Sequence, residues 1–227
     1  SGHTTIETEA EDVSRAVDSS SDTLDAMRRR IDEVSNLAQS AVRQADSLGI
    51  ETVDTPFIRK AQDVAGQVAE AFAAAIRDGR ITESALFDFR YSPMPGTNPS
   101  QYTAPFTELC DRILPDIQEP VLDFDSSVVF CVTCDRHCYL PTHNTKFSKP
   151  QSNDPVWNQA NCRNRRILDD RAMRTATANT KPFLLMGYWR DMGDRVELLK
   201  DASAPIFVHG HHWGALRIGY LAGNAGR

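Results

Sequence analysis

The sequence predicts an α+β protein in which a long N-terminal coiled-coil helix precedes an antiparallel sheet covered by helices. Three observations lead to this fold class. Apolar residues repeat every seven positions across residues 1–49, and every Trp, Tyr and Phe lies in the part of the chain that follows. The last third of the chain contains short β-branched and aromatic runs separated by turn residues. Helices that precede a run of strands are typical of a sheet covered by helices on one face.

The N-terminal segment has the heptad repeat of a coiled coil. Apolar residues recur at alternating intervals of four and three, and no Pro or Gly interrupts the segment between His3 and Leu48. A seven-residue period sustained over this length favours a supercoiled helix and predicts pairing with a second copy of the chain. One amphipathic helix lying on the domain is the alternative, although so narrow a stripe would cover a globular surface poorly. The repeat positions are Ile6, Ala10, Val13, Val17, Ser20, Leu24, Met27, Ile31, Val34, Ala38, Ala41, Ala45 and Leu48.

A boundary follows the coiled coil, so we expect a helical domain at 1–49 and a second domain at 50–227. Gly49 is suited to end the first helix, because glycine readily adopts the left-handed conformation of a helix C-terminus. Asp54 or Thr55 can cap a second helix, with Pro56 in its first turn. This leading helix is expected to span residues 55–79 and to bury its regularly spaced apolar residues.

The remaining elements follow from changes in the apolar period. A helix is expected over 106–117, and Pro115 is expected to kink or break it, because proline has no N–H group to donate within a helix. Two strands then flank a tight turn at 135–137, and a further helix is expected around 157–169. The C-terminal segment predicts four strands joined at 192–194, 202–203 and 210–211, which is a meander of antiparallel hairpins.

Composition limits the classes of function. Residues 1–55 contain twelve acidic and five basic residues, whereas the other 172 residues contain nineteen and twenty. This distribution lacks the basic stripe of a nucleic-acid-binding protein. No apolar run approaches the roughly 18 residues of a membrane-spanning helix. Five cysteines without disulfide-scaffold spacing indicate a reducing compartment, so we expect a cytoplasmic protein. Nucleophile-elbow, phosphate-loop, zinc-protease and dinucleotide motifs are missing from the sequence, so we expect no enzyme.

Several motifs resemble a known sensory family. The segments TPFI, VVFCVTCDRHCYLPTHN, WNQANCRNRRILDDR, PFLLMGYWRDM and LLKDASAPIFVHGHHWGALRIGY resemble the C-terminal sensory region of bacterial methyl-accepting chemotaxis proteins. The last of them is similar to the final hairpin of Cache domains, which are extended PAS-like ligand-sensing folds. The resemblance spans about residues 50–222 and implies a small-molecule sensor attached to a dimeric signalling helix. It also implies chemotaxis signalling proteins as partners, and a Gly at the turn position of Cys138.

The cysteine-rich segment CVTCDRHCYLPTHN leaves three interpretations open. Zinc or an iron–sulfur cluster is the first, since cysteines supply soft ligands for both. Against it, residues three apart on a strand point to opposite faces of the sheet. Small buried side chains are the interpretation that we favour, so no cofactor is expected. A redox-sensing thiol at an exposed Cys138 is the third, and His209, His211 and His212 leave a metal or haem site open. The alternative ligand set is Cys131, Cys134, Cys138 and Cys162.

The candidate ligand site is placed where a covering segment meets the sheet. Arginine offers a planar fork that suits a carboxylate, and the segment 157–171 contains several arginines. Aromatic walls and a strand-end carboxylate complete the set, which suits a small carboxylate or an amino-acid-like ligand. The alternative is that these arginines only pair with nearby acidic residues and hold the segment in place. The expected ligand-binding residues are Trp157, Arg163, Tyr188 and Asp201. A ligandless dimerisation or interaction domain remains a further possibility.

Overall fold

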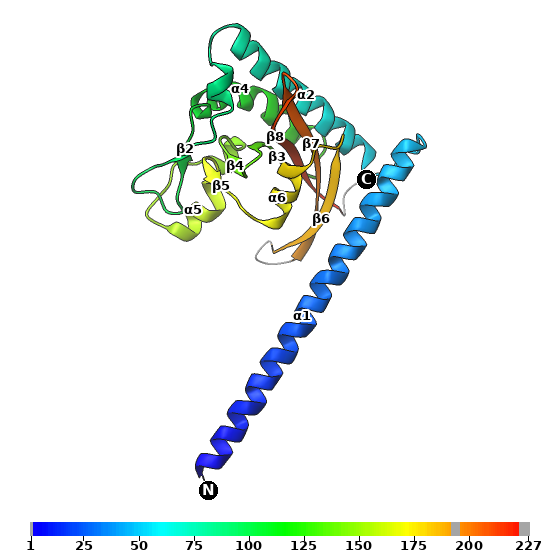
Figure 1. Cartoon of the computed structure of the whole chain (residues 1–227), viewed down its shortest axis with the longest axis vertical. Coiled ribbons are helices and arrows are strands. Elements are labelled where there is room, and N and C mark those ends of the chain that lie inside the picture. The colour runs from blue at the N-terminus through cyan, green and yellow to red at the C-terminus, as the bar shows by residue number, and fades with distance from the viewer. Residues whose placement is uncertain (1, 192–195, 223–227) are drawn as a thin grey trace. The chain divides into compact units, whose positions relative to one another are not determined.

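The chain forms two compact units, residues 1–50 and 51–227. The computed structural model describes residues 2–191 and 196–222. The first unit is a single helix, α1 (Gly2–Ser47), shown in Figure 1. It ends as the sequence predicts: Gly49 has a φ of 69°, and the N–H of Ile50 donates to the carbonyl of Ala45 at 2.8 Å. The helix is therefore present, while its pairing into a coiled coil stays a prediction.

The second unit is organised around a four-stranded antiparallel sheet. Its strand order is β3-β8-β7-β6, with β3 at Val128–Asp135, β6 at Leu184–Asp191, β7 at Val196–Val208 and β8 at His211–Leu221. The β7–β8 turn places His209 and Gly210 at φ values of 49° and 80°, a conformation that favours tight hairpins. The central strands are buried, because both faces of the sheet are covered.

One face of the sheet, called the closed face below, packs against α2 (Thr55–Arg77) and α4 (Thr107–Gln118). The ring of Phe57 in α2 stacks on Tyr220 in β8, with centroids 3.8 Å apart. A β-bulge leaves Trp213 without a partner on β7, and its ring lies 4.8 Å from that of Phe72 in α2. Pro115 does not break α4, which runs on to Gln118 and is followed by the short 3-10 helix η1 (Glu119–Asp123).

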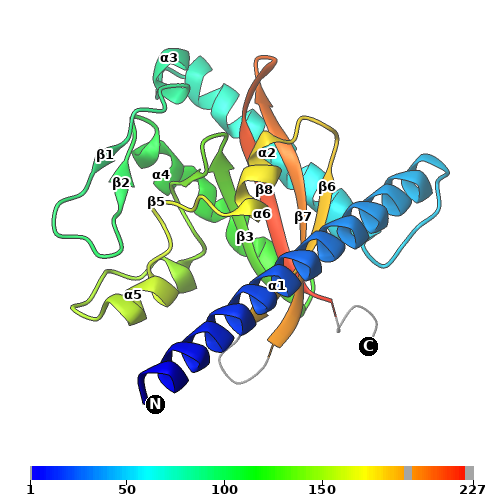
Figure 2. The same cartoon turned by 60° about the horizontal axis from the view of Figure 1, so that its bottom comes forward.

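The opposite face, called the cavity face, lies under a covering segment of short elements. These are β4 (Tyr139–Leu140), η2 (Thr145–Phe147), α5 (Pro155–Asn161), β5 (Arg166–Ile167) and α6 (Arg171–Ala178). Figures 1 and 2 show α6 and α2 on opposite sides of the sheet. A further short helix, α3 (Glu83–Leu86), and the two-stranded β1 (Ser92–Pro93) and β2 (Tyr102–Thr103) connect α2 to α4.

Two of the expected element boundaries are wrong. The strand β7 runs without a joint through Ala202 and Ser203, where a turn was expected. Small residues are needed there because Ala202 is fully buried and lies on the same face as Lys200, which contacts the start of α2. The helix expected over 157–169 is also too long, since α5 ends at Asn161 and Arg165 has a left-handed φ of 58° that no helix continues. The joint expected at 192–194 lies outside the described residues.

The turn after β3 explains why a glycine is expected at its end. Cys138 has a φ of 69°, a conformation that glycine adopts at the lowest cost, and its N–H donates to the carbonyl of Asp135. The expectation that this turn exposes Cys138 is wrong, because only 6% of the residue is accessible. The following strand β4 pairs with β5 rather than with β3, so the expected hairpin stops at the turn. Across the part of the chain that the structure describes, no helix is long and apolar enough to cross a membrane.

Candidate functional site

A cavity of about 460 Å³ lies between the cavity face of the sheet and the covering segment. This size falls within the range of roughly 300–1,000 Å³ that is typical of small-molecule sites. The strands contribute its floor, and the chain from β4 to α6 contributes its walls and rim. The lining residues are Phe130, Val132, Leu140, His143, Phe147, Arg163, Leu168, Asp170, Arg171, Ala172, Met173, Tyr188 and Arg217.

A buried ion pair lies in the floor of the cavity. Arg217 in β8 donates from Nη2 to Oδ2 of Asp201 in the neighbouring strand β7 at 2.5 Å, and both residues are at least nine-tenths buried. Its Nη1 contacts the sulfur of Met173 in α6 at 3.3 Å, while Nε has no hydrogen-bond partner. This Nε is shielded from solvent, so what Arg217 offers to a ligand is the part of its side chain that lines the cavity.

The electrostatics of the pair keep the guanidinium charged. Burial alone would lower the pKa of Arg217, but the adjacent Asp201 carboxylate raises it above its ordinary value. Burial raises the pKa of Asp201, and the guanidinium opposes that rise. Because a buried pair of this kind is costly to desolvate, it is weak evidence for stability.

The rim of the cavity is positioned by the N-terminus of α6. Asp170 is the N-cap of this helix, and its Oδ1 accepts from the N–H of Met173 at 2.8 Å. That bond fixes the first turn of α6, which places both Arg171 and Met173 in the lining of the cavity. The preceding chain is attached to the turn after β3 through the N–H of Leu168, which donates to the carbonyl of Cys138 at 3.0 Å.

Aromatic rings form one wall. The ring of His143 lies between Phe130 and Phe147, with centroid distances of 6.1 and 4.9 Å. Its Nδ1 accepts from the backbone N–H of Asn144 at 2.7 Å, which requires that nitrogen to be unprotonated. The side-chain carbonyl of Asn144 accepts from the N–H of Cys131 in β3 at 2.9 Å, so the wall is tied to the sheet. An apolar wall beside a fixed cation is a common design for binding sites.

The structure brings together some of the residues expected from the sequence. Arg163 and Tyr188 both line the cavity, and Arg163 is placed there by its N–H, which donates to the carbonyl of Phe147 at 2.7 Å. Asp201 lies behind Arg217 and orients it, rather than lining the cavity itself. Trp157 is not among the residues that line the cavity. It lies on α5, the helix that Asp154 caps, and 41% of it is exposed.

Sequence reasoning missed Arg217, the most buried cation of the cavity. A signal was present, because Arg217 is the one charged residue in the run from Trp213 to Leu221, and Asp201 is a carboxylate within the strand before it. Charged residues inside buried strands are nearly always paired. The register of β7 and β8 places the two residues diagonally across the ladder, since Ala202 is the partner of Ile218 and Ser203 is the partner of Arg217.

The alternative metal set is not assembled in the structure. Cys131 and Cys134 lie on opposite faces of β3, and Cys162 bonds to the carbonyl of Pro150 instead. Within 2–191 and 196–222, no three His, Cys, Asp or Glu side chains gather as a metal-binding group, the turn histidines included. Burial raises the pKa of the Cys131, Cys134 and Cys138 thiols, which disfavours the thiolate that metal binding and redox chemistry need.

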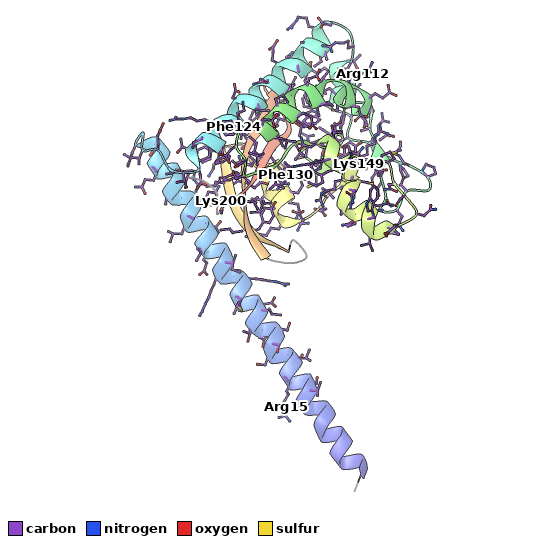
Figure 3. The ribbon with its side chains drawn as sticks, turned by 180° about the vertical axis from the view of Figure 1, so that it is seen from behind. Arg15, Arg112, Phe124, Phe130, Lys149 and Lys200 are labelled. Carbon is purple, nitrogen blue, oxygen red and sulfur yellow. The ribbon has the colours of Figure 1, made fainter. Side chains whose placement is uncertain are left out.

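A second buried network connects the closed face to the start of α2. Lys200 is the neighbour of Asp201 in β7 and points to the other face, where Nζ donates to both carboxylate oxygens of Asp54 at 2.8 Å. The hydroxyl of Tyr220 donates to the same carboxylate at 2.9 Å. Asp54 stands at the N-cap position of α2, as expected, but its side chain binds the sheet rather than the helix. Figure 3 marks Lys200 and, on the cavity face, Phe130.

The chain was also compared with known proteins. It matches no protein-family model, and no curated sequence is significantly similar to it. The resemblance to chemotaxis sensory regions therefore remains a prediction, and the functional argument depends on the cavity.

Proposed function

We propose that residues 51–222 are the sensory module of a cytoplasmic chemoreceptor-type signal transducer that binds a small carboxylate or amino-acid-like molecule. The module passes its state to a homodimeric coiled coil formed by α1, and through it to chemotaxis signalling proteins. The observation that carries this proposal is the charged guanidinium of Arg217, buried at the floor of a cavity of about 460 Å³. We propose a binding role and no enzymatic one.

The guanidinium of Arg217 supports an anionic ligand, because it is buried in the cavity floor and Asp170 is the one carboxylate among the described lining residues. The planar fork of a guanidinium matches a carboxylate with two parallel hydrogen bonds, and such bonds are stronger where water is excluded. Arg217 is held in place by Asp201 before any ligand arrives, so little side-chain entropy is lost on binding.

The exposed apolar stripe of α1 supports the homodimer. Val17, Leu24 and Ile31 are 61%, 55% and 45% exposed, although they stand at successive equivalent positions of the heptad repeat. A stripe of this length is unfavourable in water, and a second copy of the same helix offers a matching stripe. The second copy is therefore the partner that fits the repeat.

A route from the cavity to the helices is supported by the two buried networks. Asp201 and Lys200 are consecutive residues of β7 that point to opposite faces, so a shift of this strand acts on both networks. The second network ends at Asp54, a few residues after Ser47, the last residue of α1. A ligand that favours one position of β7 would bias the start of α2 and the joint before it.

Binding to the intact chain tests the proposal. Isothermal titration calorimetry would use 3-phenylpropanoate, 4-methylpentanoate, succinate, phenylalanine and leucine as probes. We expect at least one probe to bind, and Arg217→Met to weaken it at least ~30-fold, because a buried charge pair with a ligand is worth about 2 kcal/mol or more. Absence of binding by every probe would contradict the proposal.

Matched variants separate binding from folding. Arg112→Met removes an exposed arginine of α4 that does not line the cavity and is marked in Figure 3, and it should leave the affinity unchanged. The double variant Asp201→Asn/Arg217→Met removes both charges of the buried pair, so it avoids an unpaired carboxylate. If this double variant is as stable as the wild type and binds the probe as tightly, Arg217 does not contribute to ligand binding.

A further inference from the structure

Three aromatic rings follow one another along the wall of the cavity. Phe130 belongs to β3, whereas His143 and Phe147 belong to the chain after β4. The ring of His143 meets that of Phe130 at an angle of 71° and that of Phe147 at 64°, so neighbouring rings pack edge to face. This series brings aromatic side chains from two separate segments to the same side of the cavity.

Contacts outside the cavity hold the two phenyl rings in place. Gly219, the cross-strand partner of Phe130, has no Cβ and so leaves room for the Phe130 ring. The ammonium of Lys146 lies over the ring of Phe147, 5.2 Å from its centroid. Rings that are held before a ligand arrives lose little conformational entropy when it binds. The wall is therefore suited to contribute directly to affinity.

The aromatic wall adjoins the buried cation of the cavity floor. The guanidinium carbon of Arg217 lies over the ring of Phe130, 5.9 Å from its centroid. A carboxylate that reaches this guanidinium therefore brings the atoms attached to it close to Phe130. The aliphatic side chains of the lining, Val132, Leu140 and Leu168, contact a saturated and an aromatic group alike. Selection between two such groups then depends on the three rings.

An aromatic group in this cavity gains an interaction that a saturated ring of similar size does not. Aromatic pairs prefer edge-to-face or offset arrangements, which add to the free energy of burial. A saturated ring presents somewhat more apolar surface, so burial alone would favour it over the aromatic ring. The two contributions predict opposite orders of affinity, and the measured order distinguishes them.

We infer that the ligand of this cavity contains an aromatic ring, which packs against Phe130 and Phe147 while its carboxylate binds Arg217. This inference rests on the proposed function and narrows it, since it selects aryl compounds among small carboxylates and amino-acid-like molecules. It applies to an aryl acid with or without an α-ammonium group, because the selection is made by the ring.

Matched probes that differ only in the saturation of one ring test the inference on the intact chain. Titration calorimetry compares 3-phenylpropanoate with 3-cyclohexylpropanoate, and phenylalanine with cyclohexylalanine. In each pair that binds, we expect the aryl member to bind at least ~3-fold more tightly, because aromatic contacts are worth a factor of this size. Equal or tighter binding of the saturated members would overturn the inference and leave the sensory function in place, as would binding of 4-methylpentanoate, leucine or succinate alone. Failure of every probe to bind would overturn both.

Phe147→Leu adds a reading that a loss of folding cannot imitate, because it compares two ligands on the same variant. Leucine keeps an apolar side chain in the wall but removes the ring, so the preference for the aryl member should fall at least ~2-fold. Phe124→Leu is the matched control and should retain the preference, since Phe124 is an exposed ring outside the cavity lining (Figure 3). An unchanged preference in Phe147→Leu would overturn the inference that this wall holds the ring.

Discussion

The two faces of the four-stranded sheet differ in how completely they are filled. On the closed face, rings from α2 stack directly on β8 and small residues of β7 allow the helix to lie close. On the cavity face, the covering segment leaves about 460 Å³ above Arg217 and Phe130. The same strands thus support a well-packed core on one side and a charged cavity on the other. Stability and binding are therefore expected to respond to different substitutions.

Strands β3 and β8 belong to both faces, and Gly214 offers the largest perturbation of their pairing. A Cβ at this position would lie 2.0 Å from the backbone carbonyl oxygen of Cys134 and 2.6 Å from the Cα of Asp135. Backbone atoms cannot rotate away, so Gly214→Ala must separate the strands. We expect a loss on the order of 3 kcal/mol or more in the free energy of unfolding, measured by urea denaturation.

Gly66→Ala is the matched control for this substitution. Gly66 lies within α2, and a Cβ there meets no atom within 4 Å. Because alanine is the better helix former, the control should gain about 0.5–1 kcal/mol. A Gly214→Ala chain as stable as this control would show that β3 and β8 are not in the register described.

The closed face also contains a carboxyl group whose surroundings contrast with those of Asp201. Asp135 accepts hydrogen bonds from the hydroxyl of Tyr91 and from the N–H groups of His137 and Tyr139, but it has no buried arginine partner. Burial, partly opposed by these bonds, raises the pKa of Asp135 from 3.8 to about 6. Between these two values, the folded chain holds a proton that the unfolded chain has lost, so stability falls as the pH rises through this window.

Asp135→Asn should remove this pH dependence. Between pH 4 and pH 7, the free energy of unfolding of the wild type is expected to fall by about 2–3 kcal/mol relative to that of the variant. Urea denaturation at several pH values measures it, and the comparison of the two chains cancels the other titrating groups. Parallel pH profiles for both chains would mean that Asp135 titrates alike in the folded and unfolded states.

Local patterns in the sequence predict the elements of this fold better than they predict its cavity. Gly49 and Gly210 were recognisable because a positive φ has a local chemical signature, although the turn lies at 209–210 rather than at the expected 210–211. Ala202 and Ser203 were misread as a turn because small residues also occur where a helix crosses a strand closely. The reason for their size is a contact with α2, a segment more than a hundred residues earlier in the chain.

The candidate site shows the same limit. Arg163 was found because arginines cluster in its own segment, and Tyr188 because it is an aromatic residue within a strand. Arg217 was missed because its importance depends on Asp201, and only the pairing of β7 with β8 brings them together. Trp157 has the right chemistry, but the cap at Asp154 begins a helix that leaves it exposed.

The smallest expected change in stability, and the sharpest test of the cavity, comes from Gly219. This residue is the cross-strand partner of Phe130, and a Cβ added to it would lie 2.2 Å from the Phe130 ring. Unlike the backbone atoms beside Gly214, this ring can swing away, and the space available to it is the cavity that it lines. Gly219→Ala should therefore cost only about 1 kcal/mol of stability while weakening carboxylate binding about 10-fold. Titration calorimetry beside Gly66→Ala measures the difference. Unchanged affinity in Gly219→Ala, with the cost in stability still present, would place the ligand away from Phe130 and confine the role of this ring to packing.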